Sequence, residues 1–102
     1  MIEKNTPLQA MKVYAPIDGR IMFSNPRIES ILLTLVPGET IPPHTNPFDV
    51  LFIGMSGDLT LSEQESEVEL SALETAFVAA GKQRQLHNPG SQKARVMVIK
   101  IL

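Results

Sequence analysis

Four polar side chains of types that act in binding and catalysis lie in two short segments of this chain. Residues 38–57 read GETIPPHTNPFDVLFIGMSG and contain His44, Asn46 and Asp49. An imidazole can act as a general base or a metal ligand, and an amide or a carboxylate can accept hydrogen bonds. Arg84, in the second segment, is permanently charged and has no lone pair to give to a cation. This set suits an anionic ligand better than a metal ion.

Short apolar segments interrupted by Pro, Gly and Asn run through the chain, and this pattern is typical of β-strands joined by turns. Residues 27–36 place apolar side chains at nearly alternating positions and precede a Pro-Gly pair, which indicates a long strand. Three prolines between residues 42 and 47 exclude a helix there. Residues 50–55, VLFIGM, are typical of a buried strand, and a Gly-Asp hairpin turn is expected soon after them.

Further strands are expected on both sides of this region. Residues 12–15 form a short apolar segment that contains Tyr14, the only tyrosine of the chain. Residues 94–102, ARVMVIKIL, have strong β propensity. Apolar residues alternate with polar ones before and after the acidic stretch 63–69, which indicates a solvated hairpin.

Residues 72–81, ALETAFVAAG, carry two conflicting signals. Their Ala and Leu content and the closing Gly favour a helix. The surrounding segments have a hydrophobic period of two rather than 3.6, which favours a strand. We therefore expect a strand at residues 76–79, AFVA. Eight or more short strands in one small chain predict an all-β sandwich or barrel.

The size and charge of the chain exclude several classes of function. At 102 residues, 43% of them hydrophobic, residues 1–102 form one domain with a single core. A net charge of −2 without a basic cluster argues against a nucleic-acid partner. No apolar run is long enough for a membrane span or a signal peptide, and the absence of Cys excludes disulfides and thiol catalysis. We expect a cytoplasmic protein with no nucleic-acid or membrane partner.

Two motifs resemble those of the cupin superfamily. Residues 38–57 have the Gly, His and closing Gly of the first cupin motif. Residues 77–90, FVAAGKQRQLHNPG, have the strand, the small-residue turn and the Asn-Pro-Gly of the second. The resemblance implies a double-stranded β-helix, a small jelly-roll barrel that holds its ligand in the mouth. It also implies a homodimer, in which the apolar N-terminal strands pair across subunits.

The resemblance further implies which residues occupy the four metal-ligand positions of the family. His44 occupies the first, and Asn46, a poor ligand for transition metals, occupies the second. The third falls at Asp49 or at the next residue, and strand alternation turns Asp49 away from the face shared by residues 50, 52 and 54. Arg84 occupies the fourth, where metal-binding relatives have a His. A conventional metal site is therefore not expected, and no cofactor is predicted.

Some of these residues also have purely structural interpretations. His44 follows two prolines and could be a loop histidine bonded to the backbone. Arg84 could be a surface residue or an ion-pair partner of Asp49 or of a Glu, and Asp49 could itself cap a turn. His87 cannot replace Arg84 in the motif, because a shift of three residues would reverse the strand parity. We interpret it as a solvent-facing residue at a strand end.

Two functions from different classes remain, and the sequence leaves open whether the protein is an enzyme. The first is a metal-free protein that binds a small carboxylate or phosphate through His44, Asn46, Asp49 and Arg84. The second is a metal-independent sugar isomerase or epimerase, in which His44 is the general base and Arg84 fixes an anionic group. A weaker third alternative is a residual divalent-metal site of His44, Asp49 and waters.

Overall fold

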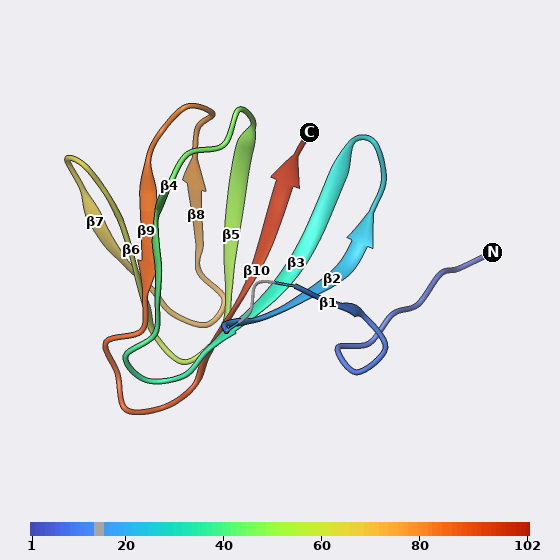
Figure 1. Ribbon diagram of the computed structural model, residues 1–102, viewed down its shortest axis with the longest axis horizontal. Helices are drawn as coiled ribbons and strands as arrows, with labels where there is room; N and C mark the ends of the chain where they lie inside the picture. Colours follow the sequence, from blue (N-terminus) through green and yellow to red (C-terminus); the bar gives the residue numbers. More distant parts are fainter. Residues whose placement is uncertain (14–15) are drawn as a thin grey trace.

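The computed structural model describes residues 1–13 and 16–102, and the regular elements in these residues are all strands (Figure 1). In this part of the chain the strands are β1 (Met11–Val13), β2 (Asp18–Ser24), β3 (Ile28–Leu35), β4 (Thr40–His44), β5 (Asp49–Ser56), β6 (Leu59–Glu63), β7 (Glu67–Leu70), β8 (Thr75–Val78), β9 (Arg84–His87) and β10 (Ala94–Ile101). Tyr14 and Ala15, which complete the predicted first strand, lie outside the described residues.

The strands form two antiparallel sheets. The larger sheet has the order β1-β2-β3-β10-β5-β8, and the smaller has the order β4-β9-β6-β7. In Figure 1 the strands of the smaller sheet lie together on the left, and β5, β10, β3 and β2 lie to their right. Neighbours in each sheet are mostly distant in sequence, as in a jelly roll, so the predicted all-β jelly-roll barrel is confirmed.

Strand alternation creates the core between the sheets. On β5 the buried side chains are Val50 and Phe52, and on β10 they are Ala94, Val96 and Val98. These positions have a period of two, so each strand turns one apolar face inward. β10 pairs along its whole length with β3 and along most of it with β5, which places these three strands at the centre of the larger sheet.

A buried amide joins the ends of several strands. Asn88 is 0% exposed, and its Nδ2 donates hydrogen bonds to the carbonyl oxygens of Leu35 (2.9 Å) and Gln92 (2.8 Å). Its Oδ1 accepts a hydrogen bond from the Gly90 amide at 2.9 Å, and its backbone amide donates to Glu39 O at 3.0 Å. Asn88 therefore ties the loop after β9 to the end of β3 and to the start of β4.

The segment with conflicting signals is a strand, as expected. β8 covers residues 75–78 and pairs with β5 from Val50↔Val78 to Ile53↔Thr75. Leu73 and Gly81 flank it with positive φ angles of 70° and 81°, a conformation that no α-helix contains. The acidic hairpin is also confirmed, because β6 and β7 pair directly around it.

No helix in the described part of the chain is long and apolar enough to cross a membrane. The cytoplasmic location and the homodimer stay predictions.

Replacing Asn88 with Ala should destabilise the fold by about 2–3 kcal/mol, because it leaves the buried Leu35 carbonyl without its donor and opens a small cavity. The measurement is urea unfolding followed by circular dichroism. Asn25→Ala is the matched control, since Asn25 accepts hydrogen bonds from two backbone amides in an exposed hairpin where water can replace it. Equal losses in the two variants would contradict this role for Asn88.

Candidate functional site

A cavity of about 740 Å³ lies between the two sheets and is lined by residues of β3, β4, β5, β9 and β10. Three of the four predicted site residues line it: His44, Asn46 and Arg84. His44 is the last residue of β4, and Arg84 is the first residue of β9; the two are cross-strand partners in the antiparallel register. The carbonyl oxygen of Asn46 accepts a hydrogen bond from the Gly81 amide at 2.8 Å. This bond ties the two motif segments together at the barrel mouth.

Asp49 does not line this cavity. Its Oδ1 accepts a hydrogen bond from the Ala80 amide at 2.8 Å, so the carboxylate holds the loop that follows β8. This matches the predicted parity, in which Val50 and Phe52 face inward and Asp49 faces the other way. The structure therefore does not bring Asp49 to one cavity with His44.

Arg84 is only 4% exposed, so its interpretation as a surface residue is wrong. It shares the inward face of β9 with the buried Leu86. Its guanidinium carbon lies 6.0 Å from the centroid of the Phe52 ring, within range of a cation–π interaction. The carboxylate of Asp49, one of its suggested partners, accepts a hydrogen bond from the Ala80 amide, and Glu63 is the cross-strand partner of Arg84. The result is a buried positive charge in the wall of the cavity.

His44 lines the cavity and is also bonded to the backbone, so its functional and its structural interpretation both apply. It is exposed at the mouth, and its Nδ1 lies 3.3 Å from the carbonyl oxygen of Pro42. The pKa of His44 lies below its usual 6.5, chiefly because the protein removes part of the water around the imidazole. The Pro42 hydrogen bond opposes this decrease, and the positive charges of Arg84 and Lys100 add to it. The imidazole is therefore neutral at pH 7 and able to accept a proton.

Lys100 is a site residue that the sequence reasoning missed. It lines the same cavity from β10, and its Nζ lies 3.4 Å from Glu29 Oε1 and 6.0 Å from the centroid of the Phe48 ring. The signal was present in the strand ARVMVIKIL. Ala94, Val96, Val98 and Lys100 occupy alternate positions, so the same periodicity that buries the first three turns Lys100 inward.

His87 lies on the other face of β9. It ends this strand, as predicted, but it is only partly exposed, which corrects the interpretation as a solvent-facing residue. Its Nδ1 lies 2.6 Å from Thr40 Oγ1, so the ring is engaged with the neighbouring strand β4 rather than with the cavity.

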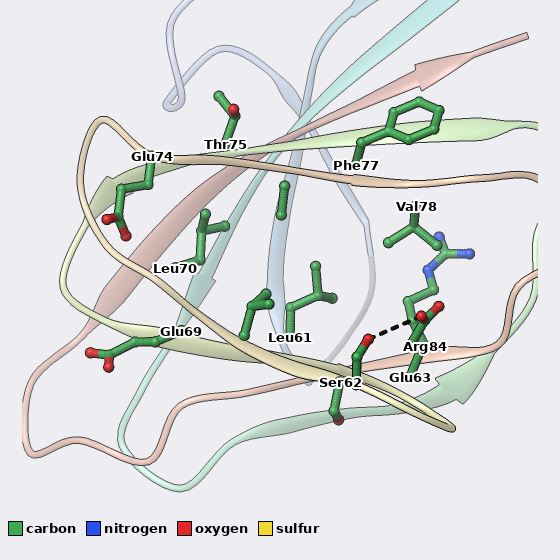
Figure 2. A pocket seen from close by; sticks show the side chains of 13 residues that line it. Leu61, Ser62, Glu63, Glu69, Leu70, Glu74, Thr75, Phe77, Val78 and Arg84 are labelled. Carbon is green, nitrogen blue, oxygen red and sulfur yellow. Dashed lines mark hydrogen bonds between the residues drawn. The ribbon is translucent and has the colours of Figure 1, made fainter.

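A second groove of about 610 Å³ lies between the β6–β7 hairpin and β8 (Figure 2). Three acidic side chains line it: Glu63, Glu69 and Glu74. Figure 2 shows Glu63 close to the end of the groove where Arg84 lies, with its carboxylate hydrogen-bonded to the Ser66 hydroxyl at 3.0 Å. Because carboxylates repel an anion, this groove is a poor place for one, and the mouth cavity is the better candidate site.

The donor set at the mouth does not fit a divalent transition metal. In residues 1–13 and 16–102, no group of three or more His, Cys, Asp or Glu side chains comes together as a set of metal ligands. His44 faces Arg84 across the strand pair, and a guanidinium repels a cation and cannot coordinate it.

Comparisons with known proteins place this architecture in context. The profile of the cupin domain matches residues 31–100. A Cupin 2 conserved barrel domain protein from Salinispora arenicola superimposes with a TM-score of 0.83 at 14% identity, over 100% of this chain and 89% of that chain. The polyketide cyclase RemF from Streptomyces resistomycificus gives a TM-score of 0.84 at 17% identity, over 99% and 80%.

A predicted oxalate decarboxylase from Thermotoga maritima gives a TM-score of 0.78 at 15% identity, over 84% of this chain and 80% of that chain. No curated protein matches the sequence. At these identities the solved structures share the fold alone, and their differing names illustrate that one barrel hosts many activities.

The pKa of His44 offers a direct test of the site electrostatics. Arg84→Met should raise it toward 6.5, because one of the positive charges that lower it is removed. NMR titration of the imidazole measures the change, and Arg95→Met is the control, since Arg95 is exposed on the outer side of β10. A His44 pKa that is identical in the wild type and in Arg84→Met would contradict the proposed electrostatic contact.

The lowered pKa of His44 also makes the free energy of unfolding depend on pH. Because the folded-state pKa of His44 lies below the unfolded value of 6.5, the unfolded chain binds the proton first as the pH falls. This residue therefore makes the fold less stable as the pH drops from above 6.5 through the folded-state pKa.

Proposed function

The chain belongs to the cupin superfamily, and we propose that it binds a small organic anion, a carboxylate or a phosphate, in the mouth of its barrel. The observation that carries this proposal is the guanidinium of Arg84, buried in the cavity wall across from His44. His44 and Asn46 are the neighbouring polar groups that would orient the ligand.

Burial is what makes Arg84 suited to this role. A positive charge with little water around it interacts strongly with an anion, because the local dielectric constant is low. A guanidinium also presents its donors in a planar fork that matches the two oxygens of a carboxylate. An anion at the mouth would thus form charge-assisted hydrogen bonds within a partly enclosed site.

A metal-independent isomerase or epimerase is the second candidate function. The observation that favours it is the lowered pKa of His44, which keeps the imidazole in its basic, neutral form at pH 7. In that reaction His44 would remove a proton from the substrate while Arg84 holds the anionic group. Binding of the anion is common to both functions, so it is the property to test first.

Anion binding should raise the melting temperature of the wild-type protein. Acetate, hexanoate, inorganic phosphate and glucose 6-phosphate form the test panel. An anion at 100 times its Kd stabilises the fold by about 2.7 kcal/mol, which corresponds to a rise of about 10 °C or more in a domain of this size. Arg84→Met should lower the affinity for the bound anion at least tenfold, because a hydrogen bond to a charged group is lost.

Arg95→Met is the matched control for this experiment, since it removes an exposed arginine whose Nε donates to Thr34 on the outer side of the sheet. It should leave anion binding unchanged. Arg84→Met keeps most of the side-chain volume, and circular dichroism of the variant establishes that it is folded before anion binding is measured. The proposal is wrong if anions raise the melting temperature of Arg84→Met as much as that of the wild type, or if no anion of the panel binds.

A metal-free site is part of the same proposal and has its own test. Protein purified without a metal-affinity tag should contain far less than one transition-metal ion per chain by elemental analysis. Added chelator should leave the melting temperature unchanged, because no metal contributes to the fold. A stoichiometric metal would overturn the interpretation of Arg84.

A further inference from the structure

We infer that the anion is an amphipathic monocarboxylic acid, whose carboxylate lies at the mouth near Arg84 and Lys100 and whose apolar body lies against the inner wall of the barrel. This inference rests on the proposed function and narrows it, because it separates hydrophobic acids from sugar phosphates. Three features of the cavity support it: the segregation of its polar groups, its charge balance and its shortage of partners for hydroxyl groups.

The polar groups are segregated at the two ends of the cavity. Nine of the fifteen described residues that line it are apolar, and they include the buried Ile31, Leu33 and Val98. His44 ends β4 and Lys100 lies near the end of β10, opposite the first residues of β3 and β5. Because the short loop 45–48 joins β4 to β5, these polar groups share one end of the barrel. A ligand that enters there meets charge first and an apolar wall behind it.

The polar residues at the far end of the cavity are already engaged. Thr40 Oγ1 lies 2.6 Å from His87 Nδ1. Glu39 Oε1 accepts a hydrogen bond from the Val36 amide at 2.8 Å. Burying a hydroxyl without a hydrogen-bond partner is unfavourable, and a sugar carries several hydroxyls. The interior wall therefore favours a hydrocarbon body over a sugar.

The charges at the mouth favour a ligand with a small negative charge. Arg84 and Lys100 line the cavity, and Glu29 lies 3.4 Å from the Lys100 ammonium. Glu63 is the cross-strand partner of Arg84 and lines the other groove beside it (Figure 2). A carboxylate carries one negative charge at pH 7, whereas a phosphate monoester carries about 1.5 to 2. The nearby carboxylates of Glu29 and Glu63 therefore repel a phosphate more strongly than they repel a carboxylate.

A chain-length series tests this inference by isothermal titration calorimetry. Acetate, butyrate and hexanoate share the carboxylate and differ only in their apolar part. Affinity should increase about three- to fourfold for each added methylene that becomes buried, hence about tenfold for every two carbons. Hexanoate should also bind more tightly than glucose 6-phosphate or inorganic phosphate.

A pair of matched variants tests whether the apolar wall of the cavity contacts the ligand. Ile41 is partly buried and lines the cavity, whereas Ile53 is partly buried on β5 but lies outside the cavity. Ile41→Thr should weaken hexanoate binding several-fold and leave acetate binding nearly unchanged. Ile53→Thr makes the same chemical change and should leave both affinities as in the wild type.

The outcomes separate this inference from the function on which it rests. If phosphate or glucose 6-phosphate binds more tightly than hexanoate and this binding is lost in Arg84→Met, anion binding stands and the monocarboxylate inference is overturned. A flat chain-length series that still depends on Arg84 overturns it as well. If no affinity in the series depends on Arg84, both proposals fail. Chain-length dependence that is lost in Ile41→Thr but kept in Ile53→Thr supports the inference.

Discussion

The completely buried amide of Asn88 is the constraint on which the candidate site depends. Both of its polar atoms are hydrogen-bonded, and their partners lie at the end of β3 and in the loop between β9 and β10. A buried amide is stable only with its hydrogen bonds made, so any slip of β9 would break them. Asn88 thereby fixes which face of β9 points into the barrel. Leu86 and Arg84, two and four residues before it, lie on that inward face.

A buried charge in a small barrel needs compensation from its surroundings. Removing water from a guanidinium is unfavourable, and the Phe52 ring 6.0 Å away supplies part of the favourable interaction in its place. The same arrangement recurs at Lys100, with Phe48 and Glu29 beside it. The mouth thus holds two cations in an environment of limited polarity. Burial of the imidazole is the main cause of the lowered pKa of His44, and the positive charges of Arg84 and Lys100 add to it.

Elements whose local signals agree were predictable from the sequence. In residues 27–36 and 94–102, alternation, β propensity and flanking turns all indicate a strand, and the strands observed there are Ile28–Leu35 and Ala94–Ile101. Residues 72–81 were harder, because their helix propensity opposes the period of their neighbours. Pairing of β8 with β5 overrides the helix propensity there, because it supplies backbone hydrogen bonds between the strands and buries Val78.

By itself, the sequence determined the all-β fold and the parity of β5, because periodicity and turn residues are local properties of the chain. Only the tertiary structure decided that Arg84 is buried rather than on the surface, and that the Asp49 carboxylate accepts a hydrogen bond from the Ala80 amide. It also decided that the inward face of β10, to which the alternation in the last strand assigns Lys100, borders the same cavity as His44 and Arg84. These outcomes depend on which strands become neighbours across the barrel, and such long-range pairing leaves no signal in the residues near each side chain.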